Sequence, residues 1–333
     1  MLKKLLGLLF VFLMSAPILA LSLNGAGATF PAPIYSKWFS QYAKETGVQV
    51  NYQAIGSGGG VRQFTAGVVD FGGTDAFMTN KEMAAAGGGV LHIPTVMGSV
   101  AVIFNLPGIS DLKLDAGSLA GIYLGEITKW NDPIIKALNP GKNLPDKNIT
   151  VVRRSDGSGT TSIFTNYLTK VSTKWASSVG EGKSVNWPVG VGGKGNFGVA
   201  GVVKQVEGAI GYVELAYAIE NNLSFASLKN KAGRFVSPTI ESTSAAAAGA
   251  LAAMPADFRI NLTNASGAAS YPIVGLTWIV VKQHQKNSEN ATTLKNLLLW
   301  CLQEGQNYAE SLHYAPLPSS LAQKVMASIN TID

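Results

Sequence analysis

The sequence predicts an α/β fold, and three observations support that prediction. From Leu23 onward, short runs rich in β-branched residues alternate with stretches of helical periodicity. Several connections between such a run and the following helix are rich in glycine and hydroxyl side chains, as expected where a strand ends and a helix begins. About 310 residues remain after an N-terminal leader, and a chain of that length usually forms two domains.

The leader comprises residues 1–20 and has the pattern of a cleaved secretory signal peptide. Two lysines precede the apolar run 5–14, and small or helix-breaking residues then lead to Ala20. The run is far shorter than the roughly 20 apolar residues that span a bilayer, which argues against an uncleaved anchor. No cysteine stands near the cleavage point, so no lipoprotein anchor is expected. The pattern therefore predicts an exported protein that does not itself span a membrane.

The remaining elements are predicted from hydrophobic periodicity and from residues that commonly begin or end helices and strands. The apolar stretch 91–106 passes through Pro94 and Gly98, which is typical of buried strands that cross between two lobes. Thr79 and Glu82 have the spacing of a capping box and predict a helix start. The composition changes near 267–272, and the segment after it is expected to complete the first domain. Strands are predicted at 48–55, 68–72 and 273–281, and helices at 61–66, 199–206, 245–253, 292–302 and 317–329.

Composition and charge exclude several functional classes. Loss of the two leader lysines lowers the formal net charge from +6 to +4, and the basic residues are scattered, so nothing indicates nucleic-acid binding. The single cysteine, Cys301, lies in an apolar helical stripe and excludes an internal disulfide. His92, His284 and His313 are far apart and lack metal-ligand spacing. We therefore expect neither a metal nor a cofactor.

Three glycine-rich connections each carry hydroxyl groups at the expected start of a helix. They place Thr29 and the amide of Phe30 in segment 25–33, Ser57 in segment 55–60, and Ser158, Gly159 and Thr160 in segment 151–161. The first turn of a helix has unpaired amides and a partial positive charge, which suit a tetrahedral anion. Each connection alone is most simply a turn. Together, at the carboxyl ends of strands in one α/β chain, they predict a shared oxyanion site.

Asp75 follows the predicted strand 68–72 and lies at the same edge of the sheet. One interpretation is a helix or turn cap. The other is an acceptor inside the anion site. Phosphate keeps a proton near neutral pH and can donate it to a carboxylate, whereas sulfate has no such proton and would leave the carboxylate unpaired. This second interpretation predicts that Asp75 distinguishes phosphate from sulfate.

Arg153 and Arg154 alternate on a strand, so only one of them can face the site, and spacing does not decide which. Asp156 is close enough to pair with the inward guanidinium, although a surface ion pair of little energetic value is the alternative. Segment 193–198 fits G-x-G-x-x-G but is interpreted as a loop that opens the following helix, not as a dinucleotide site. Ser158 has no histidine in these motifs to activate it as a nucleophile.

With these motifs in place, the chain resembles the periplasmic phosphate-binding proteins of ABC importers, the PstS type, over essentially its whole mature length. The resemblance rests on G-A-G-A-T-F-P-A-P-I-Y, I-G-S-x-G-G, V-D-F-G-x-x-D, Y-L-G-x-I-x-K-W, V-V-R-R-x-D-G-S-G-T, G-G-K-G-N and G-A-I-G-Y-V-E, which stand in the expected order. The departures are small. Gly58 stands where a second serine is common, and Thr161 stands where serine is common.

The resemblance implies a type II periplasmic-binding-protein fold, with a ligand cleft between two α/β lobes joined by a two-strand hinge. The crossings would fall near 95–100 and 269–273, which divides the chain into lobe I (residues 21–96 and 272–333) and lobe II (residues 97–271). It further implies a monomeric, non-catalytic receptor in the periplasm. Such a receptor binds inorganic phosphate and delivers it to an ABC importer of two permease subunits and a cytoplasmic ATPase.

Carried over position by position, the resemblance assigns Asp156 as the partner of Arg154 and so selects Arg154 over Arg153 as the inward arginine. The implied phosphate contacts are Thr29, Phe30, Ser57, Asp75, Arg154, Ser158, Gly159 and Thr160. The alternatives are a receptor for another oxyanion such as sulfate or molybdate, a secreted phosphatase that uses Ser158, and a structural surface protein.

Overall fold

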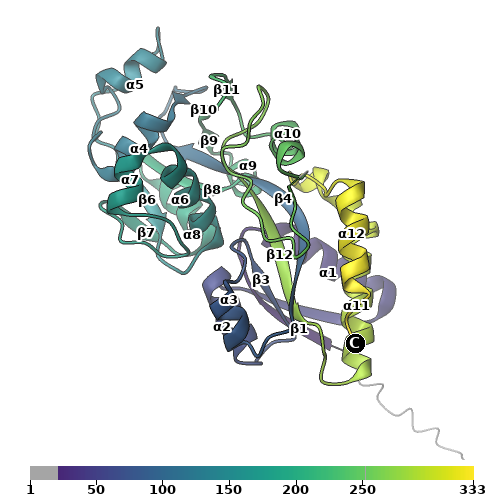
Figure 1. Cartoon of the computed structure of the whole chain (residues 1–333). Coiled ribbons are helices and arrows are strands. Elements are labelled where there is room, and N and C mark those ends of the chain that lie inside the picture. The colour runs from purple at the N-terminus through teal and green to yellow at the C-terminus, as the bar shows by residue number, and fades with distance from the viewer. Residues whose placement is uncertain (1–21, 252) are drawn as a thin grey trace, which may run out of the picture.

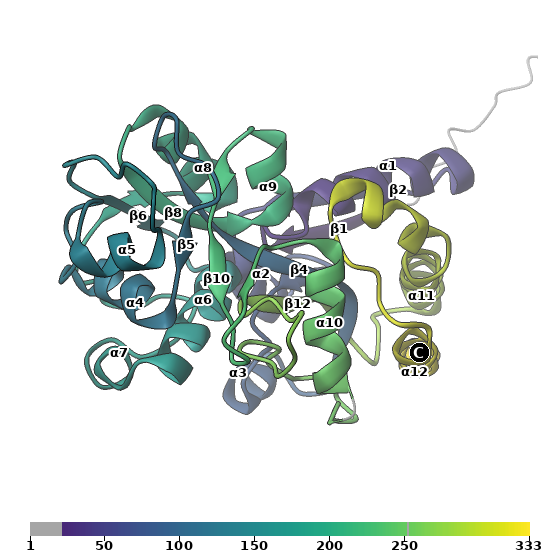
Figure 2. The same cartoon turned by 90° about the horizontal axis from the view of Figure 1, so that it is seen from above.

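The computed structural model describes residues 22–251 and 253–333, so the predicted leader lies outside the described residues. The described chain forms two α/β lobes (Figure 1). The N-terminal and C-terminal segments, purple and yellow in the figures, share one lobe, and the central teal segment forms the other (Figure 2). We call the first lobe I (β1–β3, α1–α3, β12, α11 and α12) and the second lobe II (β5–β9 and α4–α9).

A single path of hydrogen-bonded strands runs through both lobes. Its order is β2 (Gln49–Ala54), β1 (Ser22–Gly27), β3 (Phe71–Thr74), β12 (Val274–Lys282), β4 (Val90–Phe104), β8 (Ala209–Glu214), β6 (Thr150–Arg154) and β7 (Val191–Gly193), with β9 (Ser224–Phe225) also paired to β4. β1 is parallel to β2 and β3, and β6 is parallel to β7 and β8. A smaller sheet has the order β11 (Phe235–Val236), β10 (Ser227–Lys229) and β5 (Lys113–Leu114).

β4 is the strand that passes from one lobe to the other. Its residues 90–99 pair with β12, and its residues 100–104 pair with β8. At the change of partner, the amide of Val100 donates to the carbonyl of Ile273, just before β12 begins. The chain therefore crosses between the lobes at two adjacent places, near Val100 and near Ile273.

Helices cover the faces of the strands. They are α1 (Ala32–Thr46), α2 (Ser57–Thr65), α3 (Asn80–Ala85), α4 (Ala116–Leu124), α5 (Pro133–Leu138), α6 (Gly159–Val171), α7 (Thr173–Ser178), α8 (Gly195–Gln205), α9 (Leu215–Glu220), α10 (Ile240–Leu251), α11 (Ser288–Leu302) and α12 (Ser319–Ile329), with 3-10 turns at Glu304–Tyr308 and Glu310–Leu312. Within residues 22–251 and 253–333, no helix combines the length and the apolar character that crossing a membrane requires.

Most predicted elements are confirmed, with shifts at their ends. The predicted strand 68–72 starts too early, because a turn after α2 occupies residues 66–70 and pairing with β1 starts only at Phe71. Val68 is accordingly 67% exposed. α2, α8 and α10 begin several residues before the predicted starts, since glycines and hydroxyl residues at their N-termini weaken the apolar periodicity. The Thr79–Glu82 capping box opens α3 as predicted.

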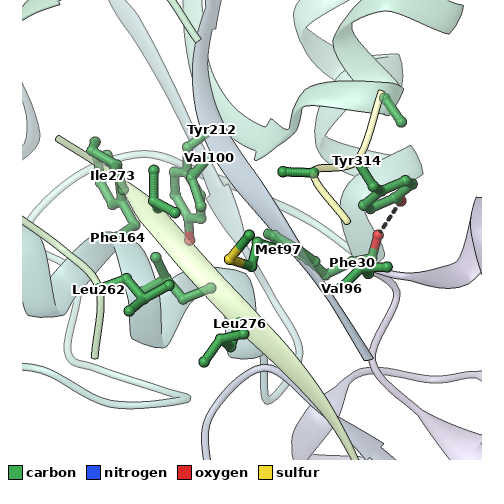
Figure 3. Close-up of a cluster of buried hydrophobic side chains, with 14 of the residues drawn as sticks. Phe30, Val96, Met97, Val100, Phe164, Tyr212, Leu262, Ile273, Leu276 and Tyr314 are labelled. Atoms are coloured by element: carbon green, nitrogen blue, oxygen red, sulfur yellow. Dashed lines mark hydrogen bonds between the residues drawn. The ribbon is translucent and has the colours of Figure 1, made fainter. Parts of the chain in front are cut away.

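The main hydrophobic core continues behind the strand crossing. Phe30 and Val96 from lobe I lie in the same buried cluster as Phe164 and Tyr212 from lobe II, with Met97 between the two groups and Ile273 beside Phe164 (Figure 3). The stacked rings of Phe164 and Tyr212 have centroids 4.3 Å apart. The crossing strands are thus packed on apolar side chains from both lobes. The lobes also meet at the polar connections that follow β2, β3 and β6.

Candidate functional site

The glycine-rich connections from both lobes meet at one place. The amide of Gly58, at the start of α2, donates to the carbonyl of Gly157 across the lobe interface, with the nitrogen 2.8 Å from the oxygen. The amide of Gly159, at the start of α6, donates to Ser57 Oγ at 3.1 Å. The N-termini of α2 and α6 therefore face each other across the lobe interface. The structure brings together the segments that the sequence marked separately.

Ser57 and Asp75 form the lobe I side of the site. Both are buried, and both follow strands that lie beside β1 in the sheet. Ser57 Oγ accepts from the amide of Asp75 at 3.2 Å and lies 3.3 Å from Asp75 Oδ2, to which it donates. The other carboxylate oxygen, Oδ1, accepts from the hydroxyl of Thr277 in β12 at 2.7 Å. These contacts hold the carboxyl group in one orientation at the lobe interface.

The environment of Asp75 makes its ionisation sensitive to pH near neutrality. Burial raises the pKa of Asp75 from its ordinary value of 3.8 to about 7, even though Thr277, the Arg154 charge and Ser57 favour the carboxylate. Desolvation therefore outweighs the donors that surround the group. A carboxyl group in this state can accept a proton from a ligand or donate one, depending on pH.

Arg154 is the arginine that reaches this interface. It is 3% exposed at the end of β6, whereas Arg153 is only partly buried and donates to the Arg154 carbonyl. Arg154 binds Asp156 with both ends of its guanidinium, through Nε to Oδ1 at 2.8 Å and Nη2 to Oδ2 at 2.5 Å. Burial alone would raise the pKa of Asp156, but the hydrogen bond and charge of Arg154 outweigh it and hold the pKa below the ordinary value. Asp156 thus stays ionised and offsets the Arg154 charge.

Three hydroxyl groups complete the lobe II side and its contact with lobe I. Ser158 caps α6, with its Oγ accepting the Thr161 amide at 3.0 Å. Thr160, in the first turn of α6, accepts from Arg154 Nη1 at 3.3 Å. Thr29, between β1 and α1, accepts from the side chain of Asn196 at 2.8 Å. Each of these three residues is 1% exposed or less.

Phe30 contributes through its backbone. Its ring is buried in the core, and its carbonyl accepts from the Tyr314 hydroxyl at 2.6 Å (Figure 3). Within the described residues, its amide donates to no protein atom. The amide follows Thr29 and precedes the first turn of α1, so it can donate to a ligand in the same place.

Close backbone approach explains the glycines at 60 and 159. A Cβ on Gly159 would lie 2.4 Å from Asp75 Oδ2 and 2.5 Å from Ser57 Oγ, on the opposite lobe. A Cβ on Gly60 would lie 2.4 Å from Gly27 Cα, so any side chain there would push α2 away from β1. Glycine at these positions lets the two helix starts and the strand ends come within hydrogen-bond reach.

A charged contact lies at the rim of the interface. Lys183 Nζ lies 2.5 Å from Glu82 Oε1 at the start of α3, and these side chains are 23% and 30% exposed. The carbonyl of Lys183 also accepts the amide of Ser158 at 2.8 Å. One residue therefore contacts lobe I through its side chain and the site through its backbone.

Asn196 and Thr277 are polar site residues that sequence reasoning missed. Asn196 follows Gly195 after the three-residue strand β7, and the short run 191–193 was too weak to be recognised as a strand before a helix start. Thr277 is a lone hydroxyl in the apolar strand β12, where alternation hides it among core residues. For Thr277 the available signal was a polar residue at a strand position that the pattern assigns to the interior, and for Asn196 it was a polar residue directly after a glycine at a helix start.

The described residues contain no group of three histidine, cysteine, aspartate or glutamate side chains placed to hold a metal ion. His92 is buried and its Nε2 accepts the Met78 amide at 2.9 Å, while burial lowers its pKa to about 4. Cys301 is buried in the core, where desolvation raises the pKa of its thiol. Both residues have structural surroundings away from the site.

Comparison with known proteins decides the family. A model described as a PBP superfamily domain matches residues 17–304. Two curated relatives named phosphate-binding protein PstS, from Pasteurella multocida and Haemophilus influenzae, are each 48% identical to this chain. The alignments cover 94% and 93% of the chain and 91% and 93% of the relatives. The chain belongs to the PstS family.

More distant structures have the same fold. A high-affinity periplasmic phosphate-binding protein bound with phosphate has a TM-score of 0.73 at 24% identity, with 92% of this chain and 94% of that chain covered. A phosphate-binding protein from Stenotrophomonas maltophilia has a TM-score of 0.70 at 21% identity, with 92% and 94% covered. This member of the PstS family therefore has the two-lobe α/β architecture that was predicted from its sequence.

Proposed function

We propose that this chain binds inorganic phosphate between its lobes and delivers it to an ABC phosphate importer, without catalysing a reaction. The curated relatives that share nearly half of its sequence carry the name phosphate-binding protein PstS. The observation that carries the proposal within the molecule is Asp75, a buried carboxyl acceptor set among hydrogen-bond donors.

The balance of donors and acceptors fits hydrogen phosphate better than sulfate. The proposed contacts are donors from Thr29, the amide of Phe30, Ser57, Arg154, Ser158, Gly159 and Thr160, together with Asp75 as the acceptor. In the structure Ser57 donates to Asp75 Oδ2 and the Gly159 amide donates to Ser57 Oγ, so these two donors would exchange those partners for the ligand. An anion that retains a proton can donate it to Asp75 and accept from all the others. Sulfate has no hydrogen to donate to the buried carboxylate and would face it as a like charge, which costs binding free energy.

The proposed site has little net positive charge. Arg154 is the only side-chain cation among the proposed contacts, and its salt bridge to Asp156 offsets it. Most of the attraction for the anion would then come from the first-turn amides of α2 and α6 and from hydroxyl dipoles. Such groups have fixed directions, so they recognise shape and protonation state better than a diffuse positive surface does.

We propose that lobe I spans residues 21–96 and 272–333 and that lobe II spans 97–271. The change of β4 from its β12 pairing to its β8 pairing after Ser99 and the adjacent crossing at Ile273 support boundaries close to these. We further propose cleavage of the leader, residence in the periplasm, a monomeric state, and delivery to an importer of two permease subunits and an ATPase.

The test is a titration of phosphate into the mature protein after bound ligand has been stripped under denaturing conditions and the protein refolded. Heat or tryptophan fluorescence reports binding, and sulfate in excess serves as competitor. Saturable phosphate binding that sulfate does not displace supports the proposal. Displacement by sulfate would favour a general oxyanion receptor, and release of nitrophenol from nitrophenyl phosphate would favour an enzyme.

A further inference from the structure

We propose that Asn196 sets the hydrogen-bond polarity of the site by occupying the acceptor positions of Thr29 and Thr160, so that both hydroxyls can only donate to the ligand. Asn196 lies at the start of α8, outside the residues that the family resemblance implies as ligand contacts. This inference rests on the proposed phosphate-binding function and assigns a positioning residue to it.

The orientation of the Asn196 amide follows from its neighbour. The backbone amide of Glu214 lies 2.9 Å from Asn196 Oδ1, and a backbone N–H can only donate. The atom that faces Glu214 must therefore be the oxygen. The amino group then points the other way, where Nδ2 lies 2.8 Å from Thr29 Oγ1 and 3.2 Å from Thr160 Oγ1.

Each threonine oxygen accepts a second hydrogen bond as well. Thr29 Oγ1 also accepts the backbone amide of Asn196 at 3.2 Å, and Thr160 Oγ1 also accepts Arg154 Nη1 at 3.3 Å. A hydroxyl oxygen has two lone pairs and one hydrogen. With both lone pairs occupied, only the O–H hydrogen of each threonine remains for another partner. No described residue accepts from either hydroxyl.

Burial enforces these hydrogen-bond directions at Thr29 and Thr160. Asn196 and Thr160 are fully buried, and Thr29 is 1% exposed, so bulk water does not compete for these atoms. An unpaired amino hydrogen or hydroxyl lone pair here would cost the full desolvation penalty. The ligand atoms opposite Thr29 and Thr160 must consequently be acceptors without hydrogen.

The same residue joins the two lobes. Thr29 belongs to lobe I, whereas Asn196 and Thr160 belong to lobe II. The Thr29 hydroxyl therefore receives its two hydrogen bonds from Asn196 only when the lobes are closed. Closure would convert a threonine hydroxyl that can donate or accept into one that only donates. The one proton of hydrogen phosphate is then directed to Asp75, the site acceptor.

A double-mutant cycle tests this role. Phosphate dissociation constants are measured calorimetrically for the ligand-stripped mature protein, Asn196→Ala, Thr29→Val and the double variant. We expect each single change to raise the Kd by about tenfold or more. We expect the double variant to lose clearly less than the product of the single effects, because Asn196→Ala acts partly by misorienting a hydroxyl that Thr29→Val has already removed.

Asn139 provides the matched control, since it is also a buried amide but lies in lobe II at β5 and α5. It donates to the carbonyls of Lys113 and Ile135 and accepts the Lys113 amide. Asn139→Ala is expected to lower the midpoint of thermal unfolding. In the double variant Asn139→Ala/Thr29→Val, we expect the increase in Kd to equal the product of the two single increases. If the Asn196→Ala/Thr29→Val variant also shows the full product of the single increases in Kd, the proposal is overturned.

Asn196→Asp keeps the experiment decisive if Asn196→Ala does not fold. Its carboxylate still accepts the Glu214 amide but has no hydrogen to donate to the threonines. The same cycle with Thr29→Val is expected to show the same less-than-multiplicative loss, and a full product would again refute the role. Failure of the wild-type protein to bind phosphate would instead overturn the proposed function and this inference together.

Discussion

Asp75→Asn is the substitution that most directly tests how the site distinguishes anions. The Asn oxygen can keep the bond from Thr277 Oγ1, which is 2.7 Å from Asp75 Oδ1. The amino group would then replace Oδ2 beside Ser57, whose oxygen already accepts the amides of Asp75 and Gly159. The hydrogens of the Asn amino group would therefore point toward the ligand. One substitution of nearly equal size turns the acceptor that we propose for the ligand hydrogen into a donor.

The expected magnitude follows from the interaction that changes. A hydrogen bond that involves a charged group contributes about 1.5–3 kcal/mol, which corresponds to about a tenfold to 150-fold change in affinity. Sulfate would gain a donor and lose a facing carboxylate, whereas hydrogen phosphate would lose its acceptor but also some repulsion. We therefore expect the preference for phosphate over sulfate to fall by that factor, mainly because sulfate binds better.

The assay is calorimetric titration of both anions at about pH 8, where Asp75, with a pKa of about 7, is ionised. Asp146→Asn is the matched control, because that carboxylate pairs with Lys129 at the surface of lobe II. The control should keep the wild-type preference. If the Asp75→Asn variant still ignores excess sulfate, then the carboxylate is not the discriminating group and the argument from proton donation fails.

Three further predictions concern charge. Arg154→Ala should weaken phosphate binding by about 1.5–3 kcal/mol or more, because a charged donor is lost and Asp156 is left unpaired beside the anion; unchanged calorimetric affinity would contradict the assignment. Lys183→Met should raise the phosphate Kd by about two- to fivefold, since it removes the contact with Glu82 across the lobe interface. That difference should vanish in high salt, and its persistence there would show that packing, not charge, is responsible. Finally, burial raises the pKa of Asp75 from 3.8 to about 7, so the folded, ligand-free protein holds this proton more tightly than the unfolded chain does. Its contribution to stability should be complete below about pH 4 and lost as the pH rises through 7, a change of about 4 kcal/mol. Urea unfolding of wild type and Asp75→Asn across this range measures it, and a constant difference between them would refute it.

The sequence predicted the local features well because they depend on neighbouring residues. The Thr79–Glu82 capping box, the helix start at Ser158 and the long apolar strand through Gly98 all follow from short-range chemistry. The placement of Thr29, Ser57 and Ser158 at strand-to-helix connections likewise follows from glycine and hydroxyl patterns. What lies at one end of one element can be inferred from its own residues.

Partnerships between distant elements could not be inferred in this way. Thr277 reaches Asp75 only because β12 returns to the sheet antiparallel to β3, some 200 residues later. Asn196 reaches Thr29 only because the two lobes meet there. The start of β3 was placed too early for a similar reason, since the strand begins at Phe71, where Gly25 of β1 lies opposite, and not where the apolar run begins. Each case depends on tertiary pairing that local patterns do not encode.

The arrangement of charges explains why the site does not need a strongly positive pocket. A cluster of lysines would attract phosphate and sulfate alike, and salt would screen its longer-range effect. Here the Arg154 charge is offset by Asp156. Protein donors occupy the lone pairs of the Thr29 and Thr160 hydroxyl oxygens. The remaining hydrogens have fixed directions, and one carboxyl group opposes them. In the site that we propose, selectivity would therefore depend on where the ligand carries its hydrogen, and total negative charge alone would not determine binding.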